Sequence, residues 1–179
     1  MKPRVRPGRL REVGVFTWLF AHAAGWVMRT AHPPNLFLTL GRRRGLFHGW
    51  LWFAGRLMPG GRLPRRDGEL VILRVAHLRD SRYEWEHHVR LARRVGLRPA
   101  DIERVRRGPD AEGWTPRQRA LLAAVDALHR DRDLGEEVWA ELRRHLTEPE
   151  CIEFCMLAAH YEMLATVIAA LRIQPDVRR

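Results

Sequence analysis

Three ionisable side chains stand where apolar residues are expected on two neighbouring helices. Turning residues 82–95 by about 100° per residue, the α-helical step, places Glu84 and His88 inside an arc of apolar side chains. They are four residues apart, so the carboxylate can accept a hydrogen bond from the imidazole on the same face. Glu69 shares the apolar face of the preceding helix, where an unpaired charge would be costly. We interpret the three groups as one cluster equipped for general acid and base chemistry, with a structural ion cluster as the alternative.

The pattern along the chain predicts the helices that position this cluster. Apolar residues recur with helical spacing and no segment keeps a two-residue alternation, so we predict an all-α fold. A loop rich in Pro and Gly, residues 58–64, precedes a helical hairpin of residues 66–78 and 82–95, which Gly96 closes. This hairpin is expected to form the core of a bundle of about seven helices. The other helices are expected at 13–24, 45–57, 116–130, 136–146 and 148–171, with a short apolar piece at 35–40.

Length and composition suit one folded unit. A chain of 179 residues with 46% hydrophobic and 30% charged residues can bury one core. We expect a single domain over 1–179, with an N-terminal helical region at about 1–57 and a core at about 64–171. The net charge is +11, but the arginines are scattered and usually stand near Asp or Glu. We therefore expect neither nucleic acid nor a membrane as a partner.

The N-terminal stretch imitates a secretory signal. Four arginines precede the apolar run 13–24, which ends in the small-residue pattern of residues 21–23. Glu12 and His22 interrupt the stretch, and its aromatic residues suit a first amphipathic helix better, so cleavage is kept as the alternative. The run is also too short to span a bilayer.

Three segments carry a resemblance to a known family. They read Gly68-Glu69-Leu70-Val71-Ile72-Leu73-Arg74-Val75-Ala76, then Ser81-Arg82-Tyr83-Glu84-Trp85-Glu86-His87-His88, then Ala92-Arg93-Arg94-Val95-Gly96. Over 64–96 the chain resembles the carboxymuconolactone decarboxylase-like family, which includes alkylhydroperoxidase D. Weaker similarity extends through residues 114–116 to residues 160–164. The resemblance implies the all-helical bundle of the alkylhydroperoxidase D-like type and assembly into a homo-oligomer, as a dimer, trimer or hexamer.

The chain departs from the hydroperoxidase branch of this family. In that branch a glutamate, two cysteines and a histidine form a proton relay for a reactive thiol. The corresponding positions here are Glu69, Ser81, Glu84 and His88. Neither a hydroxyl nor a carboxylate can replace a thiolate, so disulfide-based peroxidase chemistry is disfavoured. Cys151 and Cys155, four residues apart in an expected helix, are poorly placed for a disulfide; we assign them no role and expect a reducing cytoplasm.

The cluster looks instead like that of the decarboxylase branch, which acts on a carboxylated lactone. Loss of CO₂ requires stabilisation of a carbanion or enolate and protonation of a carbon. The resemblance implies that His88 is the acid, that Glu84 orients it and that Glu69 sets the local charge. The expected substrate-pocket residues are Ser81, Tyr83, Trp85 and Arg74. Arg74 would hold a substrate carboxylate, with a structural salt bridge as the alternative.

The sequence thus predicts an enzyme that uses acid/base chemistry on a small carboxylated or lactone-type metabolite. His77 and His87 stand near the cluster, but no recognised zinc spacing is present, so we expect no metal and no cofactor. One alternative is a peroxiredoxin-like antioxidant protein of the same fold. The other is a non-enzymatic oligomeric binding protein in which the cluster is a structural ion network.

Overall fold

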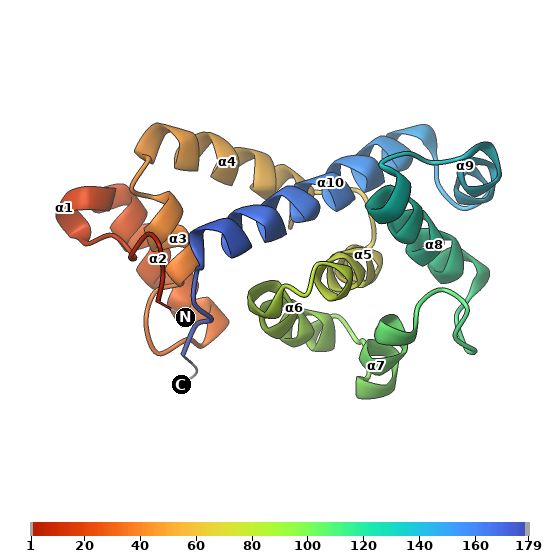
Figure 1. Ribbon diagram of the computed structural model, residues 1–179, viewed down its shortest axis with the longest axis horizontal. Helices are drawn as coiled ribbons and strands as arrows, with labels where there is room; N and C mark the ends of the chain where they lie inside the picture. The colour runs from red at the N-terminus through yellow and green to blue at the C-terminus, as the bar shows by residue number, and fades with distance from the viewer. Residues whose placement is uncertain (1, 178–179) are drawn as a thin grey trace. The chain divides into compact units, whose positions relative to one another are not determined.

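The computed structural model describes residues 2–177, and these form ten α-helices and no strand (Figure 1). The helices are α1 Leu10–Val13, α2 Val15–Met28, α3 Asn35–Leu40, α4 Arg44–Leu57, α5 Arg65–Leu78, α6 Arg82–Arg94, α7 Pro99–Arg107, α8 Pro116–Asp131, α9 Glu136–Arg143 and α10 Glu148–Leu171. The all-α prediction is confirmed. The count exceeds about seven because α1 and α3 are short and because α7 was not predicted. Proline at the first position of α7 and Gly108 after its end, with φ of 93°, are typical helix boundaries.

The chain divides into two compact units. Unit 1 comprises residues 1–56 together with 167–179, and unit 2 comprises residues 57–166. The first division follows Arg56. The second lies inside α10, whose last residues belong to unit 1.

Helix α5 is the central element of unit 2. It contacts α6, α7 and α8, and every residue from 67 to 76 is buried. Its apolar side chains enter a core with the members Leu70, Leu73, Ala92, Leu97, Ile102, Val105, Trp114 and Leu122. A helix surrounded in this way must bury whatever polar side chains it carries, and this explains why Glu69 is removed from water.

Helices α5 and α6 form the predicted hairpin. They are joined by residues 79–81, of which Asp80 has a left-handed φ of 48°. The Ser81 N–H donates to the Ala76 carbonyl at 2.8 Å, which ends α5 and sets the direction of α6. At the far end of α6, Gly96 has a φ of 87°, as its position in the sequence predicts.

Unit 1 is built around aromatic side chains. Its helices α2, α3 and α4 bring together Phe20, Phe37, Phe47 and Trp50, with ring centroids 5.4–6.3 Å apart. The C-terminal residues join this unit by backbone hydrogen bonds, in which Arg4 N–H donates to the Leu171 carbonyl and Ala31 N–H donates to the Val177 carbonyl.

Helix α10 is long and apolar enough to cross a membrane, the one helix of which this is true between residues 2 and 177. About 44% of its most apolar stretch is buried within the protein. Phe154 and Leu157, on the part that belongs to unit 2, are at most 1% exposed. We therefore interpret this part of α10 as a core helix.

Candidate functional site

Glu69 and His88 form a buried pair between α5 and α6. His88 Nδ1 lies 2.8 Å from Glu69 Oε2, and His88 and Glu69 are 6% and 0% exposed. The second carboxylate oxygen, Oε1, lies 3.7 Å from the guanidinium of Arg65, one helical turn earlier. With Nδ1 donating to a carboxylate, Nε2 is the ring nitrogen left for proton exchange.

Glu84 stands in the first turn of α6 and is held in a different electrostatic state. It is 2% exposed, and burial raises the pKa of its carboxyl group from 4.5 to about 8. The negative charge of Glu162 raises this pKa further, whereas the Ser81 hydroxyl and the Arg79 guanidinium lower it. Among residues 2–177, neither oxygen of Glu84 has a well-aligned hydrogen-bond partner. Glu84 is therefore a neutral carboxylic acid at neutral pH.

The pairing within the cluster differs from the expected one. The i,i+4 spacing predicts that Glu84 orients His88, but the carboxylate that contacts the imidazole is Glu69. Side chains on a helix lean toward its N-terminus, so Glu84 is directed toward Ser81 at the start of α6, whereas His88 reaches across to α5. The sequence identifies all three buried groups but not their partners.

Two residues of α10 complete the cluster. The ring of Tyr161 meets that of His88 edge-on at 5.0 Å between centroids, and His160 lies next to Tyr161. Burial raises the Tyr161 pKa, and the charges of Glu69 and Glu84 raise it further, so this phenol lies near both carboxyl groups. Burial, and then His88, lower the pKa of His160 to about 4. Tyr161 thus packs against His88 and lies within electrostatic reach of both carboxyl groups.

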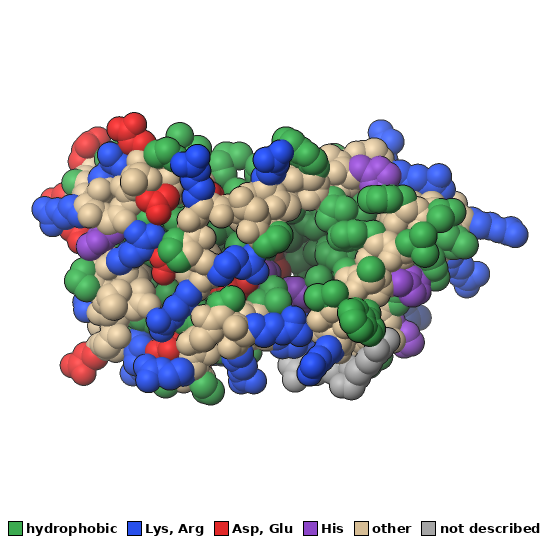
Figure 2. Space-filling view, turned by 180° about the vertical axis from the view of Figure 1, so that it is seen from behind, with side chains coloured by type: hydrophobic (Ala, Val, Ile, Leu, Met, Phe, Trp, Pro, Cys, Tyr) green, Lys and Arg blue, Asp and Glu red, His purple; other side chains and the backbone are tan. Residues whose placement is uncertain are grey.

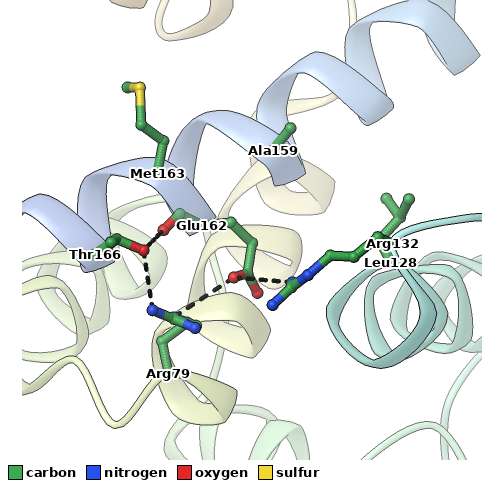
Figure 3. A pocket seen from close by; sticks show the side chains of 7 residues that line it. All are labelled: Arg79, Leu128, Arg132, Ala159, Glu162, Met163 and Thr166. Carbon is green, nitrogen blue, oxygen red and sulfur yellow. Dashed lines mark hydrogen bonds and ion pairs between the residues drawn. The ribbon is translucent and has the colours of Figure 1, made fainter.

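Unit 2 also contains a pocket of about 310 Å³ (Figure 3). Its lining consists of Arg79, Leu128, Arg132, Ala159, Glu162, Met163 and Thr166. Two of its charged residues, Arg79 and Glu162, also act on the pKa of Glu84. The acid therefore lies within electrostatic reach of the pocket.

Glu162 is the centre of the pocket's charges. Its Oε1 lies 2.6 Å from His129 Nδ1, and its Oε2 lies 3.5 Å from both Arg79 and Arg132. Arg79 also donates to the Thr166 hydroxyl at 2.9 Å, as Figure 3 shows. The sequence predicts no role for these residues. Their signal is Glu162, the one charged residue in the apolar stretch 154–171 of α10.

The four predicted substrate-pocket residues do not line this pocket. Ser81 is buried next to Glu84, and Tyr83 is buried on the same helix. Trp85 packs against the apolar core and stacks under the Arg106 guanidinium at 4.2 Å. It is a structural residue on the side of α6 that meets α7.

Arg74 is a structural residue as well. Its Nε and Nη2 form paired bonds of 2.6 and 2.7 Å with the Asp126 carboxylate, and its Nη1 donates to the carbonyls of Val105 and Arg106. The alternative of a salt bridge is thus confirmed. A guanidinium with all three nitrogens engaged by the protein has little capacity left to bind a substrate carboxylate.

The described residues offer no site for a metal. No group of three or more His, Cys, Asp or Glu side chains with suitable geometry occurs among residues 2–177. His77 lies beside Trp85, and its pKa is lowered first by burial. His87 contacts His88, and its pKa is lowered by burial and by the neighbouring cations. Of the two adjacent histidines, His88 meets a carboxylate.

The two cysteines are free thiols on α10. Cys151 is buried, and burial raises the pKa of the Cys155 thiol. A thiol with a raised pKa carries little thiolate at neutral pH and is a weak nucleophile.

Comparison with known proteins identifies the sequence pattern and the fold. Residues 44–127 match the model of the Carboxymuconolactone decarboxylase family. This segment covers the α5–α6 hairpin and therefore Glu69, Ser81, Glu84 and His88. No curated protein matches the chain.

Several solved structures share the fold at low identity. An uncharacterized peroxidase-related protein with an alkylhydroperoxidase AhpD core from Ralstonia eutropha JMP134 is 19% identical, with a TM-score of 0.84 over 97% of this chain and 92% of its own. A peroxidase-related protein from Silicibacter sp. TM1040 is 16% identical, with a TM-score of 0.82 over 98% and 94%. The debrominase Bmp8, solved as a cysteine-to-alanine variant in complex with 2,3,4-tribromopyrrole, is 18% identical, with a TM-score of 0.81 over 97% and 92%.

Proposed function

We propose that the chain, which matches the Carboxymuconolactone decarboxylase family model over residues 44–127 and shares the fold of AhpD-like proteins, is an acid/base enzyme acting on a small carboxylated or lactone-type metabolite. The observation that carries the proposal is the state of Glu84. A buried carboxyl group with a pKa of about 8 is a proton donor at neutral pH, and it lies near a pocket with two arginines.

The proposed roles follow from the contacts. Arg79 and Arg132 at the pocket attract a substrate carboxylate. Glu162 holds both arginine side chains in place when no substrate is bound. When the C–C bond to the carboxylate breaks, its electron pair stays on the substrate as an enolate and CO₂ leaves. Glu84 then donates its proton to the substrate carbon, becomes a carboxylate and regains a proton from water.

Glu69 and His88 form the second part of the proposed machinery. Glu69 fixes the imidazole by accepting from Nδ1, so that Nε2 of the doubly protonated ring can donate a hydrogen bond to the enolate oxygen. These roles differ from those expected from the sequence, in which His88 is the acid and Glu84 orients it. Here Glu84 is the acid and Glu69 orients His88. The change rests on the 2.8 Å contact of His88 with Glu69 and on the neutral state of Glu84.

Glu84→Gln tests the proposal against a panel of unsaturated lactone acids, with CO₂ release as the measurement. The amide keeps the shape of the side chain but cannot donate the proton, so we expect kcat to fall by about 10²–10⁴-fold. Glu86→Gln is the matched control, because Glu86 lies on the same helix and pairs with the exposed Arg82. Equal rates in wild type and Glu84→Gln would refute the role of Glu84.

A second candidate, thiol-based peroxidase chemistry, is supported by the AhpD-like neighbours. It would have to use Cys151 and Cys155, since Ser81 and Glu84 occupy the other two expected positions. Hydroperoxide turnover that is abolished in Cys151→Ala/Cys155→Ala would favour it, and turnover that survives would exclude both thiols. The neighbour that binds tribromopyrrole supports a small ring compound as the kind of substrate in either case.

A non-enzymatic binding protein is the third candidate. If the protein only binds a ligand, Glu84→Gln and His88→Ala would change assembly or ligand binding but would not change turnover of any lactone acid in the panel. Homo-oligomer formation and a cytoplasmic location remain predictions, which size-exclusion chromatography with light scattering and cell fractionation would test.

A further inference from the structure

The net charge of the protein is divided unequally between the two units. Residues 1–56 and 167–179 hold 13 of the 32 Lys and Arg residues but only two of the 21 Asp and Glu residues. Unit 1 therefore carries the whole formal charge of +11, and unit 2, with 19 basic and 19 acidic residues, carries none. Along the sequence the arginines look scattered and paired with acids. When the residues are counted unit by unit, basic and acidic residues balance in unit 2 alone.

Unit 1 also exposes large apolar side chains on one face of α2. Val15, Phe16, Leu19, Trp26 and Val27 are 57–72% exposed. Turned by about 100° per residue, they fall within one arc, while Thr17, Ala21 and Gly25 on the opposite side are buried. No charged residue occurs between Arg11 and Arg29 except Glu12. This face therefore carries no Lys, Arg, Asp or Glu along its length, and arginines stand at both ends.

Helix α4 continues this apolar and basic surface. The Phe16 ring meets His48 of α4 edge-on at 5.1 Å, which joins the exposed faces of the two helices. Trp52 is 67% exposed and lies under the Arg56 guanidinium at 5.0 Å, and Leu46, 71% exposed, follows the exposed residues 42–44, all arginines. Figure 2 shows hydrophobic side chains next to Lys and Arg side chains over this unit, on the right of the view.

The acidic side chains of unit 1 do not neutralise this surface. Glu12 pairs with Arg6 and Arg42, and Asp176 accepts from the Asn35 backbone N–H. Arg9, Arg11 and Arg43 are exposed and belong to none of the ion pairs found among residues 2–177. The cationic excess therefore faces solvent beside the apolar side chains.

We propose that the exposed face of α2 and α4 binds the surface of an anionic phospholipid membrane. Aromatic and aliphatic side chains enter the boundary between headgroups and acyl chains, and arginines bind lipid phosphates. At 14 residues α2 is about 21 Å long, shorter than the roughly 30 Å hydrocarbon core, so it lies in the surface and does not span the bilayer.

The charge distribution favours a lipid surface over the other possible occupants. A second copy of this face would bring two strongly cationic surfaces together, which repel one another. A nucleic acid would satisfy the arginines, but Val15, Leu19, Val27 and Leu46 would gain nothing from phosphates. An anionic bilayer offers negative charge and an apolar interior at the same surface.

Co-sedimentation of the full chain with vesicles tests this proposal. We expect binding to equimolar phosphatidylglycerol and phosphatidylcholine vesicles and weak binding to phosphatidylcholine alone. Leu19→Ser/Trp26→Ser should lower the partition coefficient by at least roughly tenfold, because both side chains leave water on binding. Ile152→Ser, an equally exposed apolar position of unit 2, is the matched control and should bind as wild type.

The charged part of the surface has its own test. Arg11→Gln and Arg43→Gln should each weaken binding about fivefold at low salt, whereas Arg107→Gln in unit 2 should not. The proposal is overturned if anionic vesicles bind no more protein than neutral ones, or if Ile152→Ser weakens binding as much as the α2 change. Dissociation of an oligomer by Leu19→Ser/Trp26→Ser without vesicle binding would assign the face to a second copy. Retention on DNA that survives this change, again without vesicle binding, would assign it to nucleic acid.

Discussion

Two buried ionic groups of unit 2 show how a structural site differs from a reactive one. Arg74 and Asp126 satisfy one another with paired bonds of 2.6 and 2.7 Å, and two backbone carbonyls take the remaining guanidinium nitrogen. Glu84 is buried more deeply than this pair, but it lacks a well-aligned partner among residues 2–177, and its pKa rises to about 8. A buried charge with all its hydrogen bonds formed stabilises the fold. A buried carboxyl group without such partners stays protonated and can act as a proton donor.

The largest expected effect comes from breaking the satisfied group. Arg74→Ala leaves the Asp126 carboxylate and two carbonyls of the α7 end without their donor, so we expect the free energy of unfolding to fall by about 3–5 kcal/mol. Urea unfolding followed by circular dichroism measures this. A loss below about 1 kcal/mol would show that Arg74 is not needed for the fold and would restore it as a binding residue.

The second prediction concerns the stability cost of burying Glu84. The pKa of Glu84 is higher in the folded protein than in the unfolded chain. Its contribution to the free energy of unfolding is therefore fully present below about pH 4.5 and is lost as the pH rises through about 8. We expect stability to fall by several kcal/mol over this range, at most about 1.4 kcal/mol per unit of pKa shift. Glu84→Gln should flatten this part of the profile of unfolding free energy against pH. An unchanged slope in the variant would assign it to another group.

A third change separates the Glu69–His88 pair from Glu84. Glu69→Gln keeps the volume of the side chain but removes the charge that holds the imidazole, so we expect kcat to fall by about 10²-fold with the fold retained. Circular dichroism and the kcat–pH profile on an active lactone acid would be measured together. A change in KM alone would show that Glu69 serves binding and not the orientation of His88.

The smallest expected effect lies at the pocket. Thr166→Ala removes the hydroxyl that accepts from Arg79 at 2.9 Å, without disturbing buried packing. We expect KM for a carboxylated substrate to rise a few-fold, equivalent to about 0.5–1 kcal/mol, with kcat and stability unchanged. Ile152→Ser, exposed on the same helix, is the control for polarity changes on α10. Equal KM values in both variants and wild type would place the substrate outside this pocket.

The hairpin and its buried ionisable groups were predictable because they leave strong local patterns. Glu69, Glu84 and His88 stand out against the apolar arcs of two helices with clear ends, and all three are buried. Helix α7 was missed because its nine residues are mostly charged and carry too little apolar periodicity.

The partners of these groups were not predictable from one sequence. Arg74 and Asp126 are 52 residues apart, and Glu162 meets His129 across 33 residues, so only the packing of α5, α8 and α10 brings them together. The division of charge between the units was hidden for the same reason, since the last residues of α10 join the N-terminal helices.

The most direct test of the central claim is a titration of the Glu84 carboxyl carbon by ¹³C NMR, with Glu84→Gln to assign the signal. We expect a pKa of about 8, so that the group is protonated at neutral pH and can act as the proton donor. A pKa at or below the ordinary value of 4.5 would contradict it, because Glu84 would then be an ordinary carboxylate with no proton to give.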